Sequence, residues 1–209
     1  MNNRPRRTLP WLALGFCSGL AAVVVALAHR GRGETGVALA VVLAGRTAFV
    51  FFFPAYAGGA LSRLGAWPVF ATIARHGREA GLAFAGALAV HLSMLAWLFA
   101  VAEKPPAGDT VIVTFGLGAM WTLALTLSSL EQYGRVFATE PGRAFRILGM
   151  EYIAALFLYD FVISPLATGF SHKLQYAPFA LLIVVGPLMR LAAWLRHGPG
   201  VRRYSPHLR

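Results

Sequence analysis

The sequence predicts an all-α protein, a polytopic membrane bundle of six transmembrane helices with both termini in the cytoplasm. Of its 209 residues, 57% are hydrophobic and only 13% are charged, whereas soluble domains carry about 25% charged residues. Six apolar runs are each long enough to cross a bilayer, which takes about 20 helical residues. Most of the arginines lie between these runs or in the segments that flank the first and the last run.

A single integral membrane domain is expected over 1–209, with spans at about 10–28, 36–57, 79–101, 110–130, 146–168 and 175–195. The breaks between the runs contain charged residues, glycine or proline, as in Lys104-Pro105-Pro106. The longest break, 58–78, contains Trp67 and Phe70 and is predicted to be a cytoplasmic loop with an interfacial helix. A soluble helical protein would need a polar outer layer that this composition cannot supply. A membrane β-barrel would need alternating strands of about 10 residues.

The distribution of basic residues predicts the orientation, because cytoplasmic loops carry an excess of Lys and Arg. With the N-terminus inside, the outer loops hold only Arg30, Arg32, Lys104 and Lys173. The inner segments then hold Arg4, Arg6, Arg7, Arg63, Arg75, Arg78, Arg135, Arg143, Arg146, Arg196, Arg202, Arg203 and Arg209. This predicts a cytoplasmic (inner) membrane protein.

The first run also imitates a signal peptide, since basic residues precede it and Ala26-Leu27-Ala28 ends it. Cleavage there would leave five spans in the same orientation. The run is longer than a typical signal core, which favours a retained helix.

Several functional classes are disfavoured by the composition and the motifs. The formal net charge is +11, but the arginines form short loop clusters and not a continuous basic face, so nucleic acid is not the expected partner. The expected environment is the lipid bilayer. No GxGxxG follows a strand, no P-loop occurs, and the loops leave no room for a soluble domain. We therefore expect no flavin or nicotinamide site in this chain.

Ionisable residues inside spans are costly and are functional candidates by default. Matching depths suggest two pairs, Arg46 with Asp160 and Glu151 with Arg190. Such pairs act either as structural clamps or as parts of a proton or ligand path. His91 is the histidine at the centre of a span, where it can bind a neighbouring helix, relay a proton or ligate haem iron.

Several segments resemble those of a known family. The segment Glu79-Ala-Gly-Leu-Ala-Phe-Ala-Gly-Ala-Leu-Ala-Val-His91-Leu resembles the histidine-bearing helix of the ferric reductase-like transmembrane family. Arg46-Thr-Ala-Phe is similar to the helix before it, Pro105-Pro106 fits as well, and Gly149-Met-Glu-Tyr-Ile-Ala-Ala-Leu-Phe157 resembles the fifth helix. The likeness covers about 36–194 and lies mostly in apolar residues.

The resemblance implies a six-helix bundle that holds haem b between facing histidines and passes electrons to or from a redox partner protein or quinol. It assigns a cofactor-binding role, as haem-iron ligand, to His91. The chain departs from the family at the start of the fifth helix, where Arg146 stands in place of the expected histidine.

Three functions follow as alternatives: an oxidoreductase membrane subunit with haem b on His91, a structural or assembly subunit that has lost the cofactor, and a small transporter or proton-conducting protein. The last would use Arg46, Asp160 and Glu151, but no internal repeat supports it. No catalytic residue is assigned.

Overall fold

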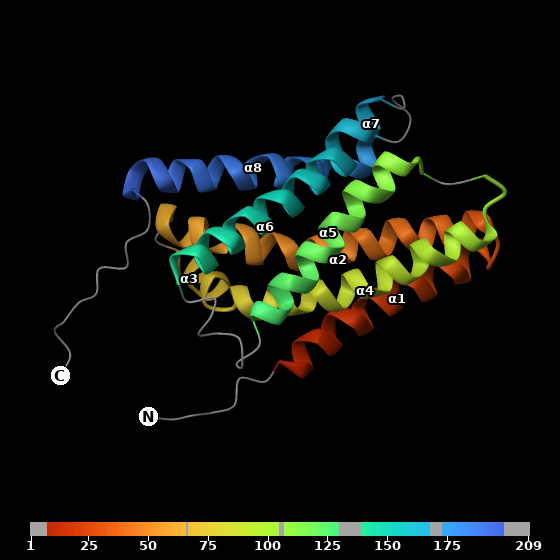
Figure 1. Cartoon of the computed structure of the whole chain (residues 1–209), viewed down its shortest axis with the longest axis horizontal. Coiled ribbons are helices and arrows are strands. Elements are labelled where there is room, and N and C mark those ends of the chain that lie inside the picture. The colour runs from red at the N-terminus through yellow and green to blue at the C-terminus, as the bar shows by residue number, and fades with distance from the viewer. Residues whose placement is uncertain (1–7, 66, 105–106, 130–138, 168–172, 199–209) are drawn as a thin grey trace.

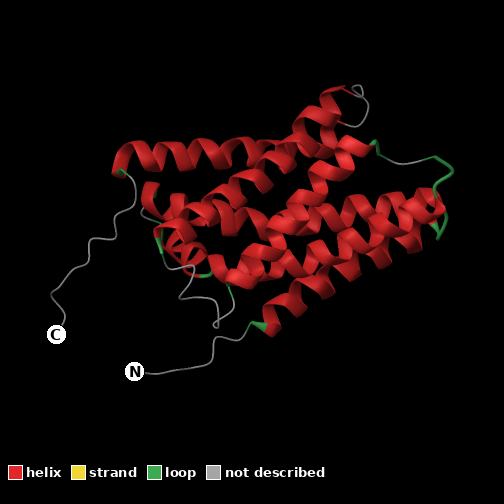
Figure 2. Cartoon of the chain, in the orientation of Figure 1, coloured by secondary structure: helices red, strands yellow, loops and turns green. Residues whose placement is uncertain are grey.

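The computed structural model of the chain describes residues 8–65, 67–104, 107–129, 139–167 and 173–198. Every regular element in these ranges is a helix (Figure 2). Some residues used in the sequence predictions lie outside the described ones, namely Arg4, Arg6, Arg7, Pro105, Pro106, Arg135, Arg202, Arg203 and Arg209.

Six helices in the described part of the chain are long and apolar enough to cross a membrane. They are α1 (Leu9–Arg30), α2 (Glu34–Leu64), α4 (Gly77–Val101), α5 (Asp109–Ser128), α6 (Glu140–Leu158) with its continuation, and α8 (Lys173–His197). Successive long helices run in opposite directions (Figure 1). The predicted all-α helical bundle is therefore confirmed, and the chain is a multi-pass membrane protein.

Helices α1, α2 and α4 pack most tightly, because small residues let their backbones approach. A Cβ atom on Gly15 would collide with the carbonyl of Ala83, and one on Gly86 would collide with the carbonyl of Leu12. α2 also packs against α8 and, more lightly, against α6. It thus packs against α1, α4, α6 and α8, whereas α5 packs against α4 and α6.

The second span extends beyond the predicted end at 57, so the segment 58–64 is helix and not loop. Pro54 lies inside α2 without ending it. The helix ends at Gly65, whose N–H donates to the carbonyl of Leu61 over 3.0 Å and whose missing side chain leaves room for the ring of Phe70. A short amphipathic helix, α3 (Pro68–Arg75), follows with Trp67 exposed at its start.

The fifth span also differs from the expected range, 146–168. α6 begins at Glu140, where Thr139 caps the helix by accepting from the N–H of Gly142 over 3.3 Å. At its other end α6 widens into a π-helical turn (Tyr159–Ile163) and continues as α7 (Ser164–Ala167). Pro165 has no N–H to donate to the carbonyl four residues earlier, so the regular α-helical ladder is interrupted at Phe161.

An aromatic cluster fills the middle of the bundle between α2, α4, α6 and α8. Phe49 is fully buried, and its ring centroid lies 5.0 Å from Phe157, 5.0 Å from Phe161 and 5.9 Å from Phe179. One helical turn further along α2, Phe52 stacks on Tyr56 at 5.3 Å. These rings form the apolar core that separates the two ends of the bundle.

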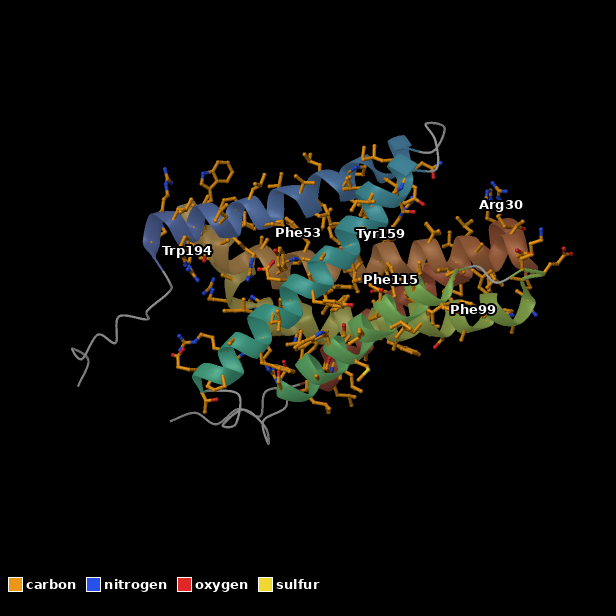
Figure 3. The ribbon with its side chains drawn as sticks, turned by 45° about the horizontal axis from the view of Figure 1, so that its top comes forward. Arg30, Phe53, Phe99, Phe115, Tyr159 and Trp194 are labelled. Atoms are coloured by element: carbon orange, nitrogen blue, oxygen red, sulfur yellow. The ribbon has the colours of Figure 1, made fainter. Side chains whose placement is uncertain are left out.

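The two ends of the bundle differ in charge. Trp194 and Arg30 lie at opposite ends (Figure 3). Among the described residues, the end near Arg30 also contains Arg32 and Lys104. The other end, called here the arginine-rich end, contains Arg63, Arg75, Arg78, Arg143, Arg146 and Arg196.

Candidate functional site

Glu151 on α6 and Arg190 on α8 form an ion pair near the arginine-rich end. Arg190 Nη2 lies 2.8 Å from Glu151 Oε1, and the two side chains are 28% and 44% exposed for Arg190 and Glu151, respectively. The structure thus brings together the two residues that depth matching had paired. Pairing lowers the cost of carrying both charges within the membrane.

Tyr56 of α2 joins this ion pair through three contacts. Its hydroxyl donates to Glu151 Oε2 over 2.7 Å. Arg190 Nη1 donates to the Tyr56 carbonyl over 3.0 Å, and its guanidinium carbon lies 4.5 Å from the Tyr56 ring centroid. We call Tyr56, Glu151 and Arg190 the Tyr56 cluster. It links α2, α6 and α8 with charge-assisted bonds.

Sequence reasoning missed Tyr56, although a signal was present. The segment 49–56 is almost entirely aromatic or apolar. A hydroxyl buried there needs a partner, since buried Tyr O–H groups are usually hydrogen-bonded. That requirement alone would have pointed to a polar side chain on a facing helix.

Arg46 lies on the face of α2 that meets α8, beside two aromatic rings. Its guanidinium carbon is 4.9 Å from the centroid of Tyr176 and 5.4 Å from that of Phe179. Asp160 in the π-helical turn interacts electrostatically with Arg46. No ion pair within 4.0 Å joins the two side chains. Arg46 Nε is buried and has no hydrogen-bond partner among the described residues. The proposed Arg46–Asp160 pair is therefore a proximity and not a bonded contact.

His91 ties α4 to α2 near the middle of the bundle. Its Nδ1 lies 2.9 Å from the carbonyl oxygen of Val41. Because a carbonyl oxygen only accepts, this nitrogen carries the proton, and Nε2 presents a lone pair. Gly45 makes the contact possible, since a Cβ there would lie 3.1 Å from His91 Nδ1 and Cε1.

The surroundings of His91 can be compared with those of a histidine that ligates haem iron. A backbone bond to Nδ1 that orients Nε2 is the usual support of a metal-binding histidine. The other described histidines, His29, His76 and His197, lie at helix ends. None of them faces His91 from a neighbouring helix at its depth.

Arg146 does not lie opposite His91 either. His91 is about 21 Å and Arg146 about 9 Å from the starts of α4 and α6, which begin at the same end of the bundle. Within the described part of the chain, no group of three His, Cys, Asp or Glu residues has metal-binding geometry. The described residues therefore do not provide the two-histidine site that the resemblance implies.

Arg78, which sequence reasoning treated only as a loop charge, joins three helices at the arginine-rich end. Its Nε and Nη2 donate to the carbonyl of Ser129 over 3.2 and 2.7 Å, and Nη2 also donates to Thr8 Oγ1 over 3.1 Å. The Ser129 carbonyl follows the last residue of α5, where the helix dipole favours a cation. A cationic residue beside the end of an apolar run was the available signal.

Two cavities open at the arginine-rich end. The smaller, of about 210 Å³, lies between α2, α4, α5 and α6; Arg78 and Arg146 line it together with hydroxyls and apolar side chains. The larger, of about 960 Å³, lies between α2, α6 and α8 beside the Tyr56 cluster. His91 and Asp160 line neither of them.

The fold and these contacts define a class of protein: a polytopic α-helical membrane protein whose ionisable residues cross-link its helices. Comparison of the chain with protein-family models, with curated proteins and with solved structures finds no match.

Proposed function

We propose that this chain is a structural or assembly subunit of a membrane complex and works without a cofactor of its own. The observation that carries the proposal is the use of the intramembrane ionisable groups. Glu151 and Arg190 bond to one another and to Tyr56, and His91 bonds to the backbone of α2. Side chains engaged in this way hold the helices in register.

The spacing of the charged groups argues against a conducting path. Arg46 and Tyr56 are ten residues apart on α2, or about 15 Å along the helix. The buried rings of Phe49 and Phe52 and the partly buried ring of Phe157 occupy the space between them. A transporter of protons or ions would need polar groups or water there, so the aromatic cluster favours a static scaffold.

We assign both termini to the cytoplasm and the protein to the cytoplasmic (inner) membrane. The support is the contrast between the arginine-rich end and the opposite end, which follows the positive-inside rule. The exposed Trp194 lies near the arginine-rich end, and the exposed Trp67 follows the end of α2 there. Indole rings suit the headgroup region.

A second candidate function is electron transfer by a haem b on His91, and one observation favours it. His91 Nε2 presents a lone pair, and no hydrogen bond to it is recorded among the described residues. If haem were bound, it would supply the one-electron chemistry, while His91 would anchor it to α4 and the Val41 carbonyl would orient the imidazole.

One purification separates the two candidates. The full chain, carrying an affinity tag, is purified from its native membranes in a mild detergent, and its visible spectrum is recorded oxidised and reduced. The assembly proposal expects a colourless protein that carries a stoichiometric partner. Haem absorption that disappears in His91→Ala but persists in His29→Ala would overturn it in favour of electron transfer. A colourless protein that purifies alone would contradict both.

A further inference from the structure

The larger cavity combines cationic and apolar groups in a way that the scaffold role does not use. We call it the α2/α6/α8 groove. Its volume is about 960 Å³ and it lies at the arginine-rich end. Each of the three helices contributes one arginine to its lining: Arg63 from α2, Arg143 from α6 and Arg190 from α8.

The charges of the groove do not cancel. Arg190 pairs with Glu151 at 2.8 Å, and Arg143 pairs with Glu140 at 3.2 Å. Arg63 is exposed, and no carboxylate within the described residues lies in ion-pair contact with its guanidinium. With three arginines and two glutamates in its lining, the groove carries one unbalanced positive charge.

The position of Arg63 is fixed by its backbone. The Arg63 carbonyl accepts a hydrogen bond from His197 Nε2 over 3.1 Å. This contact joins the end of α2 to the end of α8, so the two helices are held together beside the groove. The Arg63 side chain itself keeps its five N–H donors available.

The rest of the lining is apolar and suits hydrocarbon chains. Ile147 and Leu191 are 49% and 53% exposed, and Trp194 is 53% exposed. All three line the groove, together with Ala60, Ala193 and Pro187. In a bilayer this surface meets acyl chains, while the arginines lie at the level of the headgroups.

We propose that the α2/α6/α8 groove is a binding site for an anionic phospholipid of the adjacent leaflet. A phosphodiester headgroup carries one negative charge, which matches the unbalanced charge of the groove. Its oxygens can accept from the guanidinium of Arg63 and from the outward donors of Arg143, while the acyl chains cover Ile147 and Leu191. Basic pockets between transmembrane helices are known to hold such headgroups on the cytoplasmic side.

The test uses the full chain in nanodiscs of phosphatidylcholine, with and without phosphatidylglycerol. We expect phosphatidylglycerol to raise the melting temperature by roughly 2–4 °C. Arg63→Gln should remove most of this rise, and native mass spectrometry should show about tenfold weaker retention of the lipid. Arg75→Gln, at the same end but on α3 outside the groove, is the matched control and should keep it.

A second variant tests the apolar wall without changing any charge. Ile147→Trp fills part of the groove, so it should reduce the phosphatidylglycerol response while leaving stability in phosphatidylcholine nearly unchanged. An equal response in Arg63→Gln, Ile147→Trp and wild type would overturn the proposal. A rise produced by inorganic phosphate alone would overturn it too, because the site would then bind a free anion and not a lipid.

Discussion

The hydroxyl of Tyr56 donates to Glu151 across 2.7 Å, although the two residues are 95 positions apart in the sequence. The bond crosses from α2 to α6, and Arg190 extends it to α8. Three helices that are distant in the chain are thus joined at a single point, next to the aromatic core.

Removing the Tyr56 hydroxyl should weaken the fold by a modest and measurable amount. We expect Tyr56→Phe to lower the free energy of unfolding by about 1–2 kcal/mol, because Glu151 loses a charge-assisted bond while the ring stays packed. In a Glu151→Gln background the same change should cost clearly less. Detergent-induced unfolding of the purified variants measures both values, and equal costs in both backgrounds would show that the charge of Glu151 does not strengthen the bond.

Close packing of α1 on α4 predicts opposite effects for two glycine substitutions. Gly15→Ala should destabilise the protein by about 1–3 kcal/mol, since the new methyl group collides with the Ala83 backbone. Gly116 of α5 has no neighbouring atom within 4 Å of its Cβ position. Gly116→Ala is therefore the control and should be neutral or stabilising by up to about 1 kcal/mol. Similar losses in both variants would argue against the α1–α4 contact.

The contact between Gly45 and His91 predicts a change of sign. In the wild-type chain, Gly45→Ala should destabilise, because its Cβ would lie 3.1 Å from the imidazole that bonds to Val41. In a His91→Ala background the crowding is gone, so the same substitution should stabilise α2 by about 0.5–1 kcal/mol. The two free energies of unfolding are compared directly, and a destabilisation of equal size in both backgrounds would place the imidazole elsewhere.

Arg46 and Asp160 should be coupled more weakly than Glu151 and Arg190. Interacting pairs typically couple by about 0.5–3 kcal/mol, and the lack of an ion pair within 4.0 Å puts Arg46 and Asp160 at the lower end. A cycle of Arg46→Gln, Asp160→Asn and the double variant measures the coupling. A larger value than for Glu151 and Arg190 would mean that the two side chains meet directly in the membrane.

The sequence was sufficient for the fold class, because length and hydropathy alone decide whether a helix can span a bilayer. It did not predict the end of α2 or the beginning of α6. The predicted span ended at 57, yet α2 continues to Leu64, since helix packing overrides local propensity. The start of α6 depended on the Thr139 cap, a local bond that hydropathy does not register.

Candidate residues were easier to find than their roles. Charge inside an apolar run picked out Glu151 and Arg190, which the structure brings into contact. Tyr56 carries no charge and Arg78 lies at a span boundary, so neither stood out. The family resemblance directed attention to Arg146 as a replaced ligand, whereas that residue is exposed and lies far from the depth of His91.

The most direct test of the scaffold is a double-mutant cycle on Glu151 and Arg190, using Glu151→Gln, Arg190→Gln and the double variant. Each single change leaves a partner charge unpaired beside the aromatic core, so the account predicts that the double variant is more stable than the sum of the single losses implies, by about 1 kcal/mol or more. The free energy of unfolding in detergent provides the measurement. Strictly additive losses would contradict the claim that this ion pair holds α6 and α8 together.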